Sequence, residues 1–380
     1  MTGLPNNINA LLMVGTSEKL ADLYYATRFR APDDFVFIWI QSEKILLVSN
    51  LEVDRARQEA DVDRVIPYSD YEKKLRASGT DNPSQKDIII AVLSELKIEK
   101  IHVPNKFPMG LGDTLRANGW DLRVLHDPLF PEREIKNKNE IEYIRDSQKA
   151  AEIGMAAAID ILNQSHINKD RLIFEGNILT SEFIRRSVHL ALMNADCTAN
   201  HTIIASGEQG CDPHQEGHGP ILPHKPIIID IFPSHSQTGY FGDITRTVVK
   251  GKPSQQVLEM YETVLEAQEL ALKKIKHGVD GREIHLAVDR FFSSKGYKTG
   301  RIGGFIQGFF HGTGHGVGLE IHEPPRISQT QDTLKAGQVV TVEPGLYYRG
   351  IGGIRIEDTV VVRPNEYENL TSFPKKLEIS

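Results

Sequence analysis

Four carboxylate side chains interrupt apolar, strand-like runs in the C-terminal two-thirds of the chain, and this feature constrains the fold more than any other. The residues and their runs are Asp230 in 226–230, Asp243 in 243–249, Glu343 in 339–345 and Glu357 in 353–361. An isolated ionised carboxylate in a protein core costs several kcal/mol unless it is paired or bound to a metal ion. One such residue could lie at a strand end on the surface, but four of them predict that they face cations, because otherwise they would repel one another.

A segment rich in histidine and glycine lies between the second and third of these carboxylates. Residues 311–325 read His-Gly-Thr-Gly-His-Gly-Val-Gly-Leu-Glu-Ile-His-Glu-Pro-Pro. Glycine allows a backbone to approach a site closely. A phosphate-binding loop is the weaker interpretation, because no Lys-Ser/Thr pair follows and two prolines close the segment. The segment therefore indicates a site that uses histidine side chains.

One histidine and four carboxylates form an oxygen-rich ligand set. Such a set suits hard or borderline divalent ions such as Mn²⁺ or Co²⁺ better than a structural zinc ion, which would use thiolates. Two metal ions about 3.5–4 Å apart can bridge a hydroxide and stabilise a tetrahedral intermediate. The pattern therefore indicates a hydrolase.

Length and composition limit the other possibilities. The 380 residues fit two domains, and the net charge of −7 makes nucleic acid and anionic membranes poor partners. Cys197 and Cys211 cannot build a disulfide framework, and no apolar run approaches the roughly 18–20 residues that span a bilayer. Residues 1–7 contain no basic signal-peptide region. We therefore expect a cytoplasmic protein with free thiols.

The two halves of the chain have different patterns. Residues 34–126 alternate strand-like and helix-like segments, which predicts an α/β layer domain. Two prolines and a charged run then follow. We expect an N-terminal domain at 1–130, a linker at 131–139 and a second domain at 140–380.

The second domain is expected to be α+β. Helical spacing of apolar residues predicts long helices, and β-rich runs predict strands between them. The helices are expected at 140–162, 181–193, 255–276 and 282–294, and the strands at 201–205, 227–232, 244–249, 339–343 and 354–362.

At these residues the sequence resembles the pita-bread metallopeptidases, the family of methionine aminopeptidase, Xaa-Pro aminopeptidase and prolidase. The resemblance implies a pita-bread catalytic domain preceded by a smaller creatinase-type α/β domain. The metal ligands of the family run Asp, Asp, His, Glu, Glu in chain order. The matching positions are Asp230, Asp243, His315, Glu343 and Glu357, and all five are present.

Further positions resemble the proline-specific branch of this family. Its members carry a histidine four residues before the ligand histidine, another seven residues after it, and an arginine two residues before the last glutamate. His311, His322 and Arg355 match these positions. His214 follows a Ser-Gly-Glu-Gln-Gly-Cys segment that is similar to aminopeptidase P. Methionine aminopeptidases share the His-Glu-Pro pattern but lack the N-terminal domain.

The chain departs from the family after the first ligand. The family usually has Asp-x-Gly, whereas Asp230 is followed by Ile-Phe-Pro, and two more residues separate it from Asp243 than is usual. Because side chains alternate along a strand, two extra residues preserve the facing of both aspartates across a hairpin. We expect intact metal ligation, a longer loop at 234–239 near the site, and an altered substrate preference.

The resemblance implies a mechanism in which a metal-bridged hydroxide attacks the first peptide bond, with Glu343 carrying protons. His322 or His214 would polarise the carbonyl, and His311 and Arg355 would shape the proline-side pocket and hold the carboxylate ligands. An Xaa-Pro bond has no amide N–H, so its nitrogen must be protonated by the enzyme. The roles of His218, His224 and His235 stay open.

The main expectation is therefore an Xaa-Pro aminopeptidase with two divalent metal ions per chain, of which Mn²⁺ is preferred over Co²⁺ or Zn²⁺. Its partners would be a peptide with proline at the second position and a second copy in a homodimer, with neither nucleic acid nor membrane. An Xaa-Pro dipeptidase of the prolidase type is the alternative. A metal-free creatinase-like hydrolase and a non-catalytic binding module are disfavoured, because both would have lost ligands that this chain retains.

Overall fold

A computed structural model describes residues 8–379, and it divides the chain into two compact units, Met1–Pro131 and Glu132–Ser380. Residues 1–7, on which the expectation about a signal peptide rested, lie outside the described residues. Within 8–379 no helix has the length and apolar character that a bilayer crossing requires.

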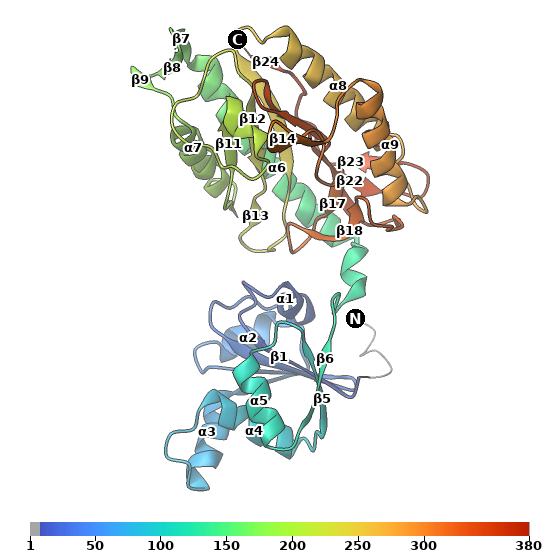
Figure 1. Ribbon diagram of the computed structural model, residues 1–380. Helices are drawn as coiled ribbons and strands as arrows, with labels where there is room; N and C mark the ends of the chain where they lie inside the picture. Colours follow the sequence, from blue (N-terminus) through green and yellow to red (C-terminus); the bar gives the residue numbers. More distant parts are fainter. Residues whose placement is uncertain (1–7, 380) are drawn as a thin grey trace. The chain divides into compact units, whose positions relative to one another are not determined.

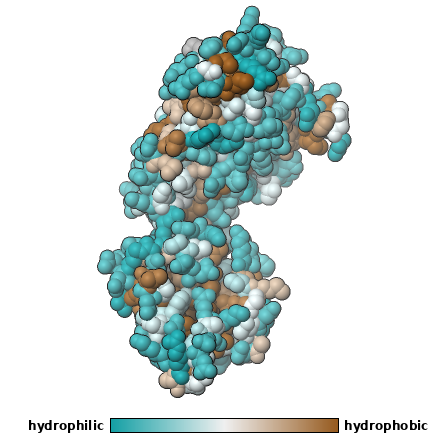
Figure 2. Space-filling view, turned by 90° about the vertical axis from the view of Figure 1, so that its left-hand side faces the viewer, coloured by the Kyte–Doolittle hydropathy of each residue, from teal (hydrophilic) through white to brown (hydrophobic). Residues whose placement is uncertain are grey.

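On the face drawn in Figure 2, hydrophobic residues form separate patches among hydrophilic ones. Cys197 and Cys211 are free thiols.

The N-terminal unit is built on a six-stranded mixed sheet in the order β4-β3-β2-β1-β5-β6 (Figure 1). The strands are β1 (Ala10–Gly15), β2 (Phe35–Ile40), β3 (Glu43–Val48), β4 (Arg64–Pro67), β5 (Lys100–Pro104) and β6 (Asp121–Leu125). The helices are α1 (Ala21–Thr27), α2 (Val53–Glu59), α3 (Tyr68–Ala77), α4 (Gln85–Glu95) and α5 (Met109–Ala117). Residues on α3, α4 and α5 share one apolar cluster with alternate residues of the central strands. Aromatic residues such as Phe29 and Phe130 contact the other face, so the sheet is buried on both sides.

The residues expected to form a linker are structured. A 3-10 helix η1 (Pro131–Glu134) is followed by helix α6 (Lys138–Gln164), whose capping box joins Asn137 and Glu140. Lys136 is buried and its Nζ lies 2.5 Å from Glu323 Oε1, within the second unit. The segment therefore belongs largely to the second unit, because a capping signal and a buried ion pair fix it there.

The second unit is built on two main sheets, each covered by a pair of helices (Figure 1). In the first half, α6 and α7 (Ser181–Met193) pack against a four-stranded sheet in the order β11-β12-β14-β24. Its strands are β11 (Ile203–Ser206), β12 (Ile227–Ile231), β14 (Ile244–Lys250) and β24 (Glu378–Ile379). The core between them is aliphatic, as the periodicity of the sequence predicts.

In the second half, α8 (Gln255–Leu272) and α9 (Gly281–Ser294) pack against a five-stranded sheet in the order β18-β17-β19-β22-β23. Its strands are β17 (Gly314–Gly316), β18 (Glu323–Ile327), β19 (Val339–Val342), β22 (Asp358–Val362) and β23 (Tyr367–Asn369). A separate hairpin of β20 (Gly345–Tyr348) and β21 (Gly352–Arg355) joins the same core.

Shorter elements complete the unit. They are β7 (His166–Asn168), β8 (Arg171–Phe174), β9 (Asn177–Ile178), β10 (Cys197–Thr198), the 3-10 helix η2 (Gly207–Cys211), β13 (Ser234–His235), β15 (Gly300–Ile302) and β16 (Phe305–Gln307). The expected loop at 234–239 contains β13, which pairs with β10. This pairing holds the longer connection between Asp230 and Asp243 against the first half of the unit.

One expected strand is divided in two. The apolar run 354–362 was expected to form a single strand, but β21 and β22 belong to different sheets and the chain leaves both at Ile356 and Glu357. Both residues are buried, so hydrophobicity alone does not reveal the break. The break places Glu357 between two sheets, which is where a side chain can reach into the space that separates them.

Two glycines of 311–318, Gly314 and Gly316, are required by close backbone approach. A Cβ at Gly314 would collide with the carbonyl oxygen of Thr341 on β19, and one at Gly316 would collide with that of Pro324 on β18. By contrast, a Cβ at Gly312 would lie 3.3 Å from its nearest neighbour, the carbonyl oxygen of Ile327. Three strands can therefore run closely side by side around His315 only because Gly314 and Gly316 carry no side chain.

We predict that Gly314→Ala destabilises the second unit by about 1–3 kcal/mol, because the new methyl group forces β17 and β19 apart. The matched variant Gly312→Ala should have a smaller effect, since its neighbours need to move only slightly. Thermal and urea unfolding of the purified proteins measures both. Equal stabilities of the two variants would contradict this account of the motif.

Candidate metal centre

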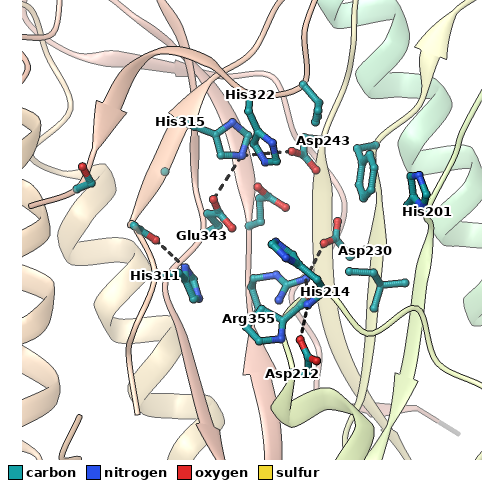
Figure 3. A pocket seen from close by; sticks show the side chains of 18 of the residues that line it. His201, Asp212, His214, Asp230, Asp243, His311, His315, His322, Glu343 and Arg355 are labelled. Atoms are coloured by element: carbon teal, nitrogen blue, oxygen red, sulfur yellow. Dashed lines mark hydrogen bonds and ion pairs between the residues drawn. The ribbon is translucent and has the colours of Figure 1, made fainter. Parts of the chain in front are cut away.

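All five predicted ligands line one pocket of about 840 Å³ between the two sheets of the second unit (Figure 3). Asp230 comes from β12, and Asp243 immediately precedes β14. His315 is the middle residue of β17, Glu343 follows β19, and Glu357 lies between β21 and β22. The side chains thus reach the pocket from both sheets.

The hairpin of β12 and β14 explains how the two aspartates come together. Asp230 pairs with Thr245, so its side chain lies on the same face as Thr245. Asp243 precedes Thr245 by two residues and shares that face. The two additional residues of the connection leave this facing intact, as expected.

Three of the ligands form a tight group. Ligand atoms of Asp243, His315 and Glu357 all lie within 4.8 Å of one another. His315 Nε2 lies 3.8 Å from Asp243 Oδ2 and 3.4 Å from Glu343 Oε1. Asp230 lies on the opposite side of the pocket from Glu343 and points toward the same space (Figure 3).

The histidine at the centre presents a lone pair to these carboxylates. His315 Nδ1 lies 3.1 Å from the carbonyl oxygen of Gly316, which can only accept a hydrogen bond, so Nδ1 carries the hydrogen. Burial and the neighbouring His322 lower the pKa of His315 to about 3, and the ring is therefore neutral. Its Nε2 lone pair faces the carboxylate oxygens of Asp243 and Glu343. A cation bound between them would satisfy that arrangement.

The pKa values of the carboxylates also indicate a site for a cation. Burial, followed by repulsion from Glu357, Asp230 and Glu343, raises the pKa of Asp243 well above its ordinary value. Burial and repulsion from Glu343 and Asp230 raise the pKa of Glu357 as well. Burial is also the largest cause that raises the pKa of Glu343 to about 7. A bound cation would remove this penalty.

Two buried carboxylate oxygen atoms have no hydrogen-bond partner among the described residues. They are Oδ1 of Asp230 and Oδ1 of Asp243. Buried carboxylate oxygens are normally hydrogen-bonded or bound to metal. With the facing lone pair of His315 and a donor set of four carboxylates and one imidazole, the residues present therefore fit divalent metal ions.

Arg355 connects the centre to a buried tyrosine that the sequence did not reveal. Its NH2 donates to Asp230 Oδ2 at 2.6 Å, and its NH1 donates to the hydroxyl of Tyr347 at 2.9 Å. The hydroxyl therefore donates its own hydrogen to His311 Nε2, 2.9 Å away, and His311 Nδ1 donates to the carbonyl oxygen of Gly312. This chain fixes one tautomer of His311 and orients Asp230 by way of Arg355.

His214 and His322 lie differently from His311. Both are exposed and both line the pocket. The ring of His322 packs edge-on against His315, with centroids 4.4 Å apart, and desolvation is the largest cause that lowers its pKa. His214 lies beside Asp230 and Arg355 (Figure 3). Their accessible imidazoles can contact a substrate.

Three further pocket residues have no functional role predicted from the sequence: His201, Glu216 and Arg326. His201 was expected within the strand at 201–205, but it precedes β11, and its Nδ1 lies 2.7 Å from Glu216 Oε1. No motif marks these positions, because the pairing of β11, β12 and β18 with their neighbours places them. Of the histidines whose roles were left open, His218, His224 and His235, none lines this pocket in the described structure.

Comparison with known proteins places this architecture in a family. Residues 142–364 match the model of metallopeptidase family M24. An Xaa-Pro dipeptidase from Pyrococcus horikoshii is 31% identical over 378 residues, which cover 98% of this chain and 95% of that protein. Among solved structures, an X-Pro aminopeptidase from Thermotoga maritima is similar with a TM-score of 0.81, 28% identity and 98% coverage of both chains. The prolidase from Pyrococcus furiosus is similar with a TM-score of 0.79 and 28% identity, covering 97% of this chain and 98% of that one.

The chain belongs to metallopeptidase family M24. Its fold is the pita-bread fold, α+β, with a smaller α/β unit before it, and its relatives belong to the proline-specific branch. The expected fold class, family and enzyme type are therefore confirmed.

We predict that Asp243→Asn stabilises the metal-free protein and weakens its stabilisation by a divalent metal ion. At pH 8 the metal-free wild type contains repelling carboxylates, so removal of one charge should raise the Tm of the metal-free protein, at about 2–4 °C per kcal/mol. The same variant should lose most of the Tm increase that a divalent metal ion gives the wild type. Differential scanning calorimetry with and without metal measures both. An equal metal-induced shift in the two proteins would exclude Asp243 as a ligand.

Proposed function

We propose that this metallopeptidase hydrolyses the peptide bond between an N-terminal residue and a following proline. The convergence of five metal-binding side chains in one pocket beside two accessible histidines carries the proposal. The names of the relatives, Xaa-Pro dipeptidase and X-Pro aminopeptidase, support the same substrate class.

Asp230, Asp243, His315, Glu343 and Glu357 would hold the metal ions. When bound, these ions would polarise the scissile carbonyl and lower the pKa of a water molecule, which then attacks. Arg355 keeps Asp230 in place through a 2.6 Å ion pair, and Thr245 donates a hydrogen bond to Glu357 at 2.7 Å. Both ligands are thereby oriented by this chain's own donors.

Glu343 is the proton carrier that the geometry favours. Its side chain is 18% exposed, compared with 11% for Asp230 and 5% for Asp243. A carboxylate that is partly exposed to the solvent in the pocket can take a proton from the attacking water and deliver it to the departing nitrogen. The proline nitrogen requires this delivery, because an Xaa-Pro bond has no amide hydrogen of its own.

His322 and His214 would steady the carbonyl oxygen as negative charge develops on it. A well-placed donor for such an oxygen contributes roughly 3–4 kcal/mol. Tyr347 fixes the tautomer of His311, so we assign His311 a positioning role with Arg355.

A second candidate, the dipeptidase activity, is favoured by Arg326. This arginine lies on β18, is exposed and lines the pocket. Within residues 8–379 it forms no ion pair. A dipeptide of the type Xaa-Pro carries its free carboxylate on the proline, and a free guanidinium beside His322 is a suitable partner. An aminopeptidase acting on longer peptides would not use this contact.

We predict that the metal-stripped protein regains hydrolysis of Xaa-Pro peptides when it is supplied with Mn²⁺, Co²⁺ or Zn²⁺. Ala-Pro, Ala-Pro-Ala and longer peptides should be compared with Ala-Ala, and the products separated by chromatography. Faster cleavage of Ala-Pro would favour a dipeptidase, and faster cleavage of the longer peptides an aminopeptidase. Inactivity on all Xaa-Pro peptides with metal bound would refute the proposal.

We predict that Arg326→Ala raises KM for Ala-Pro by about ten- to a hundredfold, because a charge-assisted hydrogen bond contributes about 1.5–3 kcal/mol. The amide Ala-Pro-NH₂ has no carboxylate and serves as the control, and its KM should change little. Steady-state kinetics of both substrates decides the point. Equal changes for the two substrates would show that Arg326 does not bind the carboxylate.

We also propose two ions per chain with Mn²⁺ as the native metal, a homodimer, and a cytoplasmic location. The five candidate ligands and the two unpartnered aspartate oxygens support two ions. The free thiols of Cys197 and Cys211 are typical of a reducing compartment. Metal analysis of the purified protein and analytical ultracentrifugation test the first and second of these points.

A further inference from the structure

One wall of the pocket is apolar and is built on the first sheet. Ile203 on β11 and Phe232, just beyond β12, both line the pocket. Ile203 pairs with Asp230, and Phe232 follows Asp230 by two residues, so both side chains lie on the face that carries the ligand. Phe232 is half-buried, which leaves part of its ring facing the pocket.

The position of Phe232 is the one at which this chain departs from its family. A glycine there, as in the usual Asp-x-Gly, would offer no side chain to a substrate. Here an aromatic ring adjoins the ligand-bearing strand, and the site keeps all five ligands around it. The departure therefore changes the wall of the pocket and leaves the metal centre intact.

The two sheets contribute side chains of opposite charge to the pocket lining. Arg326 belongs to β18, in the sheet that carries His315. Glu216 is bonded to His201 beside β11, in the sheet that carries Asp230. His201 lies on the far side of Asp230 from Glu343 (Figure 3). A peptide whose proline carboxylate faces Arg326 would direct its cationic N-terminal residue toward Glu216, and so toward the apolar wall.

We propose that Phe232, with Ile203 behind it, forms the subsite for the side chain of the N-terminal residue and gives the enzyme a preference for large apolar residues there. This inference rests on the proposed function. A leucine or methionine side chain would pack against the exposed part of the Phe232 ring, whereas glycine or alanine would leave it in water.

The test compares Phe232→Ala with the wild-type holoenzyme on Leu-Pro and Gly-Pro. The ratio of kcat/KM for Leu-Pro to that for Gly-Pro should fall about tenfold, since loss of apolar contact in a pocket changes discrimination by at least this much. Phe232→Leu retains an apolar wall and should keep most of the preference.

Phe310→Ala is the matched control. Phe310 is another aromatic residue that lines the pocket, but its ring contacts His311 and Tyr347 on the other side of the metal centre. This variant should leave the ratio between Leu-Pro and Gly-Pro unchanged, whatever its effect on the overall rate.

A binding measurement keeps the test independent of turnover. Calorimetry of the holoenzyme with analogues of Leu-Pro and Gly-Pro in which the scissile carbonyl is reduced to a methylene gives two dissociation constants, and their ratio should follow the kinetic ratio. An unchanged or increased preference for leucine in Phe232→Ala would overturn the inference. Wild-type inactivity on every Xaa-Pro peptide would instead overturn the proposed function.

Discussion

The mutual repulsion of four carboxylates around one buried point is the constraint on which the second unit depends. Asp230 and Asp243 come from one sheet, and Glu343 and Glu357 from the other, so the two halves can close only if the charge between them is balanced. Arg355 balances part of it by its ion pair with Asp230. The pKa values of Asp243 and Glu357 stay raised, which leaves the remaining balance to a bound cation.

A second buried arginine holds the two halves in register. Arg246 NH2, on β14, pairs with Asp358 at 2.9 Å and also donates to the carbonyl oxygen of Phe373, and NH1 donates to the carbonyl oxygen of Glu357. Because all of these acceptors surround a fully buried guanidinium, removing any of them would leave polar atoms unsatisfied. The network fixes the backbone at Glu357, the point where the chain passes between two sheets, and therefore fixes the direction of that ligand.

Much of this arrangement could be predicted from the sequence, and the remainder has identifiable causes. The carboxylates could be found because charge inside an apolar run is unusual, and the helix over 181–193 could be found because its apolar period is regular. Tyr347 could not, because an aromatic residue in an apolar strand resembles any core residue until Arg355 is seen beside it. The break at Glu357 was hidden for a similar reason, since the residues on both sides of it are buried.

The candidate metal ligands and the residue proposed to recognise the substrate occupy different kinds of position along the strands. The ligands sit where backbone pairing and buried donors fix them, as Asp230 does through β11, β14 and Arg355. Phe232 lies beyond the last paired residue of β12, where no strand partner restricts its size. A substitution at such a position alters the surface that a substrate meets and leaves the ligand two residues earlier in place. Variation in substrate preference is therefore tolerated just past the strand end, while the strand itself preserves the metal centre.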